Sequence, residues 1–424
     1  MAEMIETQEK KERLILVGVS TSEADDTERS LDELEELVET AGGETVGRLV
    51  QNLDRINPGT YLGTGKVEEL RELVWEADAD GVVCDDELSP AQLRNLEQAL
   101  DTKVMDRTLV ILDIFASHAG SREGKLQVEL AQLRYRATRL VGLRESLSRL
   151  GGGIGTRGPG EKKLEMDRRL IHERIGMLKA ELKEVQQHRE VTRAKRLGSH
   201  TPVAAIVGYT NAGKSTLLNA LTDANILAED KLFATLDPST RKLELENGAE
   251  LLLTDTVGFI RKLPHHLIEA FQGTLEEAKY ADYILHVVDA SNPDRDRHMY
   301  VVYETLQKLG VEGKPIITIF NKQDRVRELA AEDPAWLEPC RDLRADETIE
   351  ISAGAGEGLE ELKELLSRKL REQKVYLERV FPYAEAGRIQ QIRKYGELLE
   401  ESYEQDGIAV KAYVPAELFE QFIK

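Results

Sequence analysis

The chain has 424 residues, of which 41% are hydrophobic and 5% aromatic, and this composition predicts a soluble, helix-rich protein of two to four domains. No apolar run approaches the length of a membrane span and Met1–Arg13 is too charged for a secretory signal, so neither is expected, although contact with a membrane surface stays open. The net charge of −21 argues against nucleic-acid binding by the chain as a whole. The two cysteines, Cys84 and Cys340, offer no disulfide framework, which fits a reducing cytosol.

Residues 1–120 are expected to form a small α/β domain. Short apolar runs predict strands at 14–19, 45–50, 81–84 and 103–105, and amphipathic stretches predict helices at 30–41, 67–77 and 90–100. The alternation of strands and helices predicts a parallel sheet.

Two local signals refine this domain. Ser89, Pro90 and Gln92 form a good helix start, because the hydroxyl can cap the helix and the glutamine can reach back. The segment Gly63–Lys66 resembles a phosphate loop only superficially, since its spacing is wrong. A turn into the next helix is therefore preferred over a second nucleotide site.

Residues 121–200 are expected to form a basic, antiparallel helical hairpin. They contain 19 Lys and Arg against 10 Asp and Glu, a balance of +9, whereas the rest of the chain carries −30. Apolar residues recur at intervals of four and three over Leu126–Leu140 and again over Ile171–Val185, which predicts two helices of several turns.

A glycine-rich segment, 151–161, separates the two predicted helices and is expected to form an extended tip. Its eleven residues exceed what a tight hairpin needs, and its six glycines leave backbone amides open to close approach. With basic residues such as Arg136 and Arg139 nearby, RNA phosphate is a sensible partner, and a flexible turn beside a solvated charged surface is the alternative. The candidate RNA contacts are Gly151, Gly152, Gly153, Gly155, Thr156, Arg157, Gly158, Gly160, Lys162 and Lys163.

The most specific motif lies near the start of residues 201–370. An apolar run at 203–207 predicts a buried strand, a helix is expected at 216–221, and G-x-x-x-x-G-K-[ST] stands between them. Its glycines let backbone N–H groups surround a phosphate, Lys214 adds positive charge, and Ser215 offers a hydroxyl to magnesium. The candidate phosphate-binding residues are Gly208, Tyr209, Thr210, Asn211, Ala212, Gly213, Lys214, Ser215 and Thr216.

A second motif, D-x-x-G, follows a predicted strand at 250–254. Here Asp255 would support magnesium and the Gly258 amide would sense the γ-phosphate. Thr235, between the two motifs, is the candidate switch hydroxyl that completes the magnesium shell. The predicted catalytic residues are therefore Lys214, Thr235 and Gly258, and the predicted metal ligands are Ser215, Thr235 and Asp255. Phe233, Ala234, Thr256 and Val257 complete this part of the predicted site.

Base recognition is predicted from N-K-x-D, which follows the apolar run 315–320. The Asp324 carboxylate can accept hydrogen bonds from N1–H and the exocyclic amine of guanine, whereas adenine has no donors there. After a predicted strand at 348–351, a backbone amide would lie near guanine O6. The candidate residues are Asn321, Lys322, Asp324, Ser352, Ala353 and Gly354. A further strand is predicted at 280–289, between the D-x-x-G and N-K-x-D motifs. Together the motifs predict a P-loop GTPase domain.

Phe259 follows Gly258 where many small GTPases carry a water-orienting glutamine. Because a phenyl ring cannot polarise water, the site is either a binding-only switch or an enzyme that is slow until a partner accelerates it. The second is favoured because the other catalytic residues are present. A further hypothesis is that the Asn211 amide helps to hold K⁺ beside the phosphates, and equal GTPase rates in Na⁺ and K⁺ would contradict it.

Residues 371–424 are expected to form a small α+β domain. Strands are predicted at 375–383 and 407–414 and a helix at 389–395. No catalytic constellation is visible in them, so an adaptor role is the default.

Over nearly its whole length the chain resembles the HflX family of translation-associated GTPases. The most specific stretches are 85–94, 122–134, 151–161 and 233–238. The family pattern after the glycine loop is G-E-T-K-L-E-x-D-R-R. Here Lys162 replaces the threonine and Met166 fills the free position, which adds charge.

The resemblance implies a cytoplasmic GTPase that binds GTP and GDP with Mg²⁺ and contacts the rRNA of the large ribosomal subunit. In the GTP state such a protein separates ribosomes into subunits under heat or other stress, and the ribosome supplies what Phe259 cannot. Some relatives also hydrolyse ATP through the N-terminal domain, but no second phosphate loop supports that here. The alternatives are a GTPase of ribosome assembly or tRNA modification, and a GTP-dependent scaffold with negligible hydrolysis.

Overall fold

The structure, a computed structural model, describes residues 11–21, 26–150, 159–197, 201–222, 232–233, 239–245, 249–262 and 277–423. Within these ranges, the side chains of 141–150, 159–164, 189–197, 394 and 417 are not described. The chain divides into two units. The first comprises Met1–Glu184, Lys231–Phe233 and Lys262–Phe271, and the second comprises Val185–Asp230, Ala234–Arg261 and Gln272–Lys424. Each unit is described by itself.

The first unit contains a four-stranded parallel sheet in the order β2-β1-β3-β4. Ile15, Leu16 and Val17 of β1 are fully buried, as expected for a parallel strand with helices on both faces. The predicted alternation of strands and helices is therefore confirmed. The elements are β1 (Arg13–Ser20), α1 (Thr27–Thr40), β2 (Glu44–Asn52), α2 (Thr64–Glu76), β3 (Gly81–Cys84), α3 (Pro90–Leu100), β4 (Lys103–Asp106) and α4 (Arg107–His118).

Both local predictions in this unit are confirmed. The Ser89 hydroxyl accepts from the Gln92 amide at 3.3 Å, and Gln92 Oε1 accepts from the Ser89 amide at 2.9 Å, which is a capping box. Gly63 is the N-cap of α2, and Lys66 pairs with Glu69 one turn later at 2.8 Å. The segment Gly63–Lys66 is thus a turn into a helix.

Helix α4 is not predicted by the sequence patterns, because most of its residues are apolar and only a narrow face with Asp113, Ala116 and Ser117 is exposed. Arg107 at its first position is buried, donates to Asp85 at 2.7 Å and pairs with Glu33. Lys262 also pairs with Asp85, and with Asp86 at 2.7 Å. Burial alone would raise the pKa of Asp85, yet the charges of Arg107 and Lys262 lower it to about 2.

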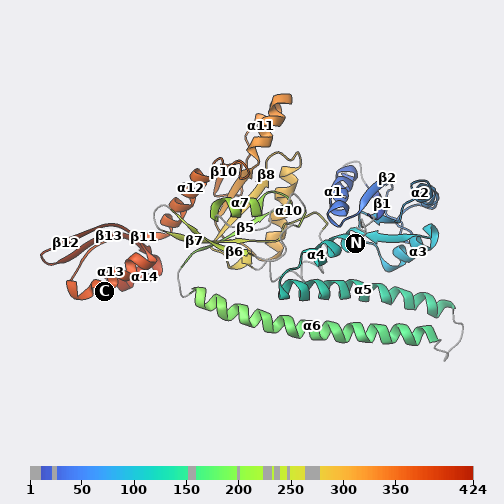
Figure 1. Cartoon of the computed structure of the whole chain (residues 1–424), viewed down its shortest axis with the longest axis horizontal. Helices are drawn as coiled ribbons and strands as arrows, with labels where there is room; N and C mark the ends of the chain where they lie inside the picture. Colours follow the sequence, from blue (N-terminus) through green and yellow to red (C-terminus); the bar gives the residue numbers. More distant parts are fainter. Residues whose placement is uncertain are drawn as a thin grey trace, which may run out of the picture. The chain divides into compact units, whose positions relative to one another are not determined.

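Helices α5 (Arg122–Leu150) and α6 (Pro159–Leu197) lie side by side and antiparallel, as the heptad-like spacing predicts (Figure 1). Arg174 of α6 donates to Glu129 of α5 at 2.7 Å. One boundary is corrected, because Pro159, Gly160 and Glu161 belong to α6 and shorten the expected eleven-residue tip. Proline is favoured in the first turn of a helix, where its missing N–H costs nothing.

The second unit is built on a six-stranded sheet in the order β10-β9-β8-β5-β7-β6, parallel except for β6. Its strands are β5 (Val203–Gly208), β6 (Ser239–Glu244), β7 (Glu250–Asp255), β8 (Tyr283–Asp289), β9 (Ile316–Asn321) and β10 (Glu347–Glu350). Its helices are α7 (Lys214–Thr222), α10 (Arg295–Lys308), α11 (Gln323–Glu332) and α12 (Leu359–Glu372), with a short 3₁₀ turn at Pro334–Leu337. The strand predicted at 280–289 starts only at Tyr283, because 277–280 are helical.

The chain ends in an antiparallel sheet in the order β11-β13-β12, with two helices. Its elements are β11 (Lys374–Phe381), a 3₁₀ turn (Tyr383–Glu385), α13 (Ala386–Tyr395), β12 (Glu397–Glu404), β13 (Gly407–Pro415) and α14 (Ala416–Ile423). Leu377, Phe381 and Val410 pack with Phe422 of α14 in its core. The predicted α+β arrangement is confirmed, although β12 is too rich in glutamate to be predicted. Across the described residues, no helix combines the length and hydropathy that crossing a membrane requires.

Candidate functional site

The phosphate loop lies at the carboxyl end of β5 and leads into α7, where a doubly wound sheet usually binds its ligand. Asn211 (φ 60°) and Gly213 (φ 92°) adopt left-handed backbone conformations. A Cβ atom on Gly208 would lie 2.3 Å from the carbonyl oxygen of Val287 in β8. A tight loop of this shape that ends at a helix N-terminus is suited to bind a phosphate group.

Lys214 is buried at the start of α7, and its Nζ donates to the carbonyl of Tyr209 at 2.8 Å. Burial lowers the pKa of the Lys214 ammonium to about 8, against the opposing charge of Asp255 and with a further lowering by Lys322. Lys214 therefore loses its proton close to the physiological pH range, and a bound phosphate group would stabilise the charged ammonium over the neutral amine.

We expect nucleotide affinity to fall as the pH rises through about 8. Bound phosphates raise the pKa of Lys214, so above pH 8 binding must take up a proton, and the Kd for GDP should rise by up to about ten-fold per pH unit. Calorimetry at pH 7 and pH 9, in buffers of different ionisation enthalpy, measures both the affinity and the proton uptake. An unchanged Kd without proton uptake at pH 9 would contradict this prediction.

The two described candidates for metal ligands lie together, since Ser215 Oγ donates to Asp255 Oδ2 at 2.7 Å. Asp255 is fully buried at the end of β7. Hydroxyl and carboxylate oxygens are ligands that Mg²⁺ prefers, and two protein ligands leave positions for phosphate oxygens and water. The residues present therefore fit Mg²⁺. No group of three or more His, Cys, Asp or Glu suited to a metal occurs in the described ranges, so the nucleotide would have to supply part of the coordination.

Gly258 packs directly against the phosphate loop. A Cβ atom there would lie 2.8 Å from Thr210 Cγ2 and 3.0 Å from Lys214 Nζ. Two neighbours of Gly258 in the D-x-x-G motif point inward, since Val257 is buried and the Thr256 hydroxyl donates to the carbonyl of Ile206 at 2.7 Å. A side chain at position 258 would thus collide with the phosphate loop. The Thr256 side chain, by contrast, is hydrogen-bonded to strand β5.

The Phe259 side chain is 1% exposed and packs in a hydrophobic cluster with Val207, Ile284 and Val302. Sequence reasoning placed Phe259 where a water-orienting side chain is common. The structure shows that the ring is a core residue. Position 259 therefore offers no group to the water that attacks a phosphate.

Asn321 joins three of the predicted motifs. Its Nδ2 donates to the carbonyl of Ala212 in the phosphate loop at 2.9 Å, and its Oδ1 accepts from the Ala353 amide at 2.9 Å. A Cβ atom on Gly213 would lie only 2.3 Å from Asn321 Nδ2. One side chain therefore sets the spacing between the phosphate loop and the loop that contains Ser352, Ala353 and Gly354.

Asp324 Oδ1 accepts from the Ser352 hydroxyl at 2.5 Å, and this hydrogen bond lowers the pKa of the carboxyl group. The neighbouring Lys322 has a left-handed backbone (φ 65°) and pairs with Asp289 at 2.8 Å. Asp289 ends β8 and lies in no sequence motif, so sequence reasoning missed it. The arrangement presents an oriented, ionised carboxylate at the edge of the sheet.

A buried polar cluster holds α10 and β9 to the loop that precedes β10, with His286 of β8 beside it. Asp342 Oδ2 accepts from the Tyr303 hydroxyl and from the Thr318 hydroxyl, each at 2.7 Å. His286 Nδ1 lies 3.8 Å from the same oxygen, which is too long for a hydrogen bond. Burial lowers the pKa of His286 below its ordinary value of 6.5, against the opposing attraction of Asp342.

We expect this cluster to destabilise the second unit in acid. Because the folded pKa of His286 is lowered, the unfolded state binds the proton first, and stability is lost as the pH falls below about 6.5. Thermal unfolding between pH 7.5 and 5.5 should show a steeper loss for the native protein than for His286→Gln. His172→Gln, on an exposed position of α6, is the matched control and should leave the slope unchanged.

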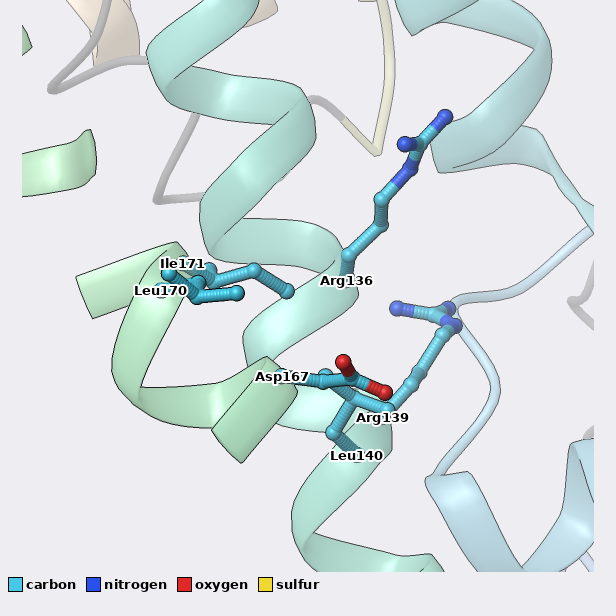
Figure 2. A pocket seen from close by; sticks show the side chains of 6 residues that line it. All are labelled: Arg136, Arg139, Leu140, Asp167, Leu170 and Ile171. Atoms are coloured by element: carbon cyan, nitrogen blue, oxygen red, sulfur yellow. The ribbon is translucent and has the colours of Figure 1, made fainter. Parts of the chain in front are cut away.

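The helical hairpin carries a hollow of about 530 Å³, which Figure 2 shows with Arg136, Arg139 and Asp167 among its lining residues. Arg139 lies 2.5 Å from Asp106 and over the Tyr135 ring, 3.1 Å from its centroid. The charge of Arg139 is therefore already paired with an acidic side chain of the same unit. Arg136 is exposed and is the better candidate of the two for an external phosphate.

Several predicted site residues lie outside the described residues, namely Ala234, Thr235, Gly151, Gly152, Gly153, Gly155, Thr156, Arg157 and Gly158. Gly160, Lys162 and Lys163 lie in α6, and the side chains of that stretch are not described. Phe233 is described, is buried, and packs edge-on against Phe115 at 4.7 Å within the first unit.

Three family models match the chain in succession. Residues 28–116 match a family described as "GTP-binding GTPase N-terminal", residues 118–196 match "GTP-binding GTPase Middle Region", and residues 203–322 match "50S ribosome-binding GTPase".

Curated relatives match over most of the chain. A protein of Lacrimispora saccharolytica named GTPase HflX is 69% identical over 419 residues, covering 99% of this chain and 97% of that protein. A protein of the same name from Caldanaerobacter subterraneus is 50% identical and covers 99% of this chain and 94% of that protein. One from Escherichia coli is 41% identical and covers 87% of this chain and 85% of that protein. A crystal structure of the protein SsGBP with GDP is 26% identical and covers 84% of this chain and 98% of that one, with a TM-score of 0.45.

Proposed function

The chain belongs to the HflX family of GTPases, and on that premise we propose that in its GTP state it binds the large ribosomal subunit and separates ribosomes into subunits under stress. The protein is a GTP hydrolase. We propose that it acts in the cytoplasm with Mg²⁺ and that the ribosome accelerates hydrolysis.

The nucleotide part of the proposal rests on the way Asn321 joins the phosphate loop to the base-binding loop. Asn211, Gly213 and the start of α7 would bind the phosphates, with Lys214 as the local cation. Ser215 and Asp255 would hold Mg²⁺, and the ion would supply positive charge to the phosphate oxygens. Asp324 would accept from guanine, and the Gly258 amide would donate to the γ-phosphate.

Water activation is a step to which position 259 contributes no side chain. Phe259 is buried in the core, so slow hydrolysis by the protein alone is expected. Stimulation by the ribosome would then supply the missing interactions. GTPase turnover with and without large subunits tests this, and equal rates would contradict it.

The ribosomal part of the proposal rests on the hairpin α5–α6. Residues 121–200 carry +9 in a chain of net −21, and the two helices extend over 29 and 39 residues. The candidate contacts at 151–163 would bind rRNA phosphates. Binding of GTP would favour the conformation that docks, and hydrolysis would release it.

Sedimentation with purified large subunits tests the coupling between nucleotide and ribosome. We expect cosedimentation with a non-hydrolysable GTP analogue and little with GDP, and a Lys162→Glu/Lys163→Glu variant should lose it while it still binds nucleotide. Equal sedimentation in both nucleotide states would refute the coupling.

The same preparation separates the two alternative functions. Preference for precursor particles or tRNA would favour a role in assembly or tRNA modification. Absence of multiple-turnover phosphate release would favour a scaffold.

A further inference from the structure

Tyr209 is the first residue of the phosphate loop after Gly208, and its side chain contacts two other elements of the second unit. Its hydroxyl accepts a hydrogen bond from the backbone amide of Arg261 at 2.9 Å. Its ring stacks on His298 of α10, with centroids 3.7 Å apart and planes 4° from parallel. The side chain is 6% exposed, so both contacts are shielded from water.

The backbone on either side of Tyr209 is already paired with the segment that follows Gly258. The Phe259 amide donates to the Gly208 carbonyl at 3.0 Å, and the Thr210 amide donates to the Phe259 carbonyl at 2.8 Å. The bond from Arg261 to the Tyr209 hydroxyl extends this pairing by two more residues. It is the one contact of the three that a side chain makes, so it depends on residue type.

We propose that Tyr209 is a positioning residue that keeps the segment Gly258–Arg261 aligned with the phosphate loop, so that the Gly258 amide meets the γ-phosphate. GDP lacks the γ-phosphate and requires only the loop itself. Loss of the hydroxyl should therefore lower the affinity for a GTP analogue and the kcat, and leave the affinity for GDP unchanged.

The stack on His298 gives the Tyr209 ring a fixed orientation. The Tyr209 oxygen stays beside the Arg261 amide only while the side chain keeps its direction, and the stack on the parallel His298 ring restrains that direction. The same stack links the phosphate loop to α10. Helix α10 therefore takes part in the alignment of the segment after Gly258, although none of the sequence motifs includes it.

The test compares Tyr209→Phe with the native protein. We expect affinity for a non-hydrolysable GTP analogue and kcat to fall by about 2- to 12-fold, the range for one hydrogen bond, with GDP affinity unchanged. His298→Ala should act in the same direction, and His298→Phe should restore the native values because it restores the stack. Tyr300→Phe is the matched control, since Tyr300 is 59% exposed on the same helix.

The inference rests on the proposed nucleotide site, and its failure can be told apart from the failure of that site. A native protein that binds no GDP would refute the site. Equal losses of GDP and GTP affinity in Tyr209→Phe would show a purely structural role and overturn the inference. Unchanged kcat and unchanged affinity for the GTP analogue would overturn it as well.

Discussion

Asp324→Asn is expected to weaken GTP binding by on the order of 10³- to 10⁴-fold and to shift preference toward xanthine nucleotides. A carboxylate accepts from both N1–H and the exocyclic amine of guanine. In the asparagine variant, the side-chain N–H₂ would face an N–H donor of guanine. Both donors would then lack a hydrogen-bond acceptor. Xanthine carries a carbonyl in place of the amine, so the amide N–H₂ would find an acceptor. Competition of XTP and GTP for labelled GDP measures the change.

The structure supplies two comparison variants for this measurement. Ser352→Ala removes the hydroxyl that donates to Asp324 at 2.5 Å and should cost only about 3- to 10-fold, because the carboxylate remains but loses its orientation. Asp333→Asn alters an exposed carboxylate at the other end of α11 and should leave both affinities unchanged. If Asp324→Asn binds GTP as tightly as the native protein does, Asp324 does not recognise the base.

Gly213→Ala is expected to weaken the binding of GDP and GTP alike by about 30- to 5,000-fold. The new methyl group would overlap Asn321 Nδ2, which lies 2.3 Å from the position of a Cβ atom, and the backbone at φ 92° disfavours any side chain. Backbone strain of roughly 1–2 kcal/mol and a disrupted buried hydrogen bond of about 1–3 kcal/mol together account for that range. Equilibrium titration with fluorescent GDP gives the affinity.

Gly65→Ala is the matched control for Gly213→Ala. Gly65 belongs to the segment that resembles a phosphate loop, and a Cβ atom there would meet nothing within 4 Å. Nucleotide affinity should be unchanged in this variant. A loss of affinity would instead reveal a second nucleotide site at the start of α2, and native affinity in Gly213→Ala would contradict the predicted contact with Asn321.

Sequence prediction failed in three ways, and each has its own physical cause. Helix α4 is mostly apolar and mostly buried, and its narrow exposed face gives only a weak helical period. Strand β12 is rich in glutamate, because it lies at the edge of an antiparallel sheet with one face open to water. The strand at 280–289 and the tip at 151–161 were predicted too long, since element ends depend on local hydrogen bonds that periodicity does not report.

By itself the sequence determined the alternation of strands and helices in residues 13–106 and the chemistry of the nucleotide motifs, because strand and helix periods and a fixed motif spacing are properties of neighbouring residues. Only the tertiary structure decided what the side chains at these positions do. It showed that Phe259 is a core residue, that Arg139 is neutralised by Asp106, that Asn321 connects two loops, and that Tyr209 contacts Arg261 and His298. These contacts join residues distant in the chain, and sequence spacing says nothing about distances across a packed interior.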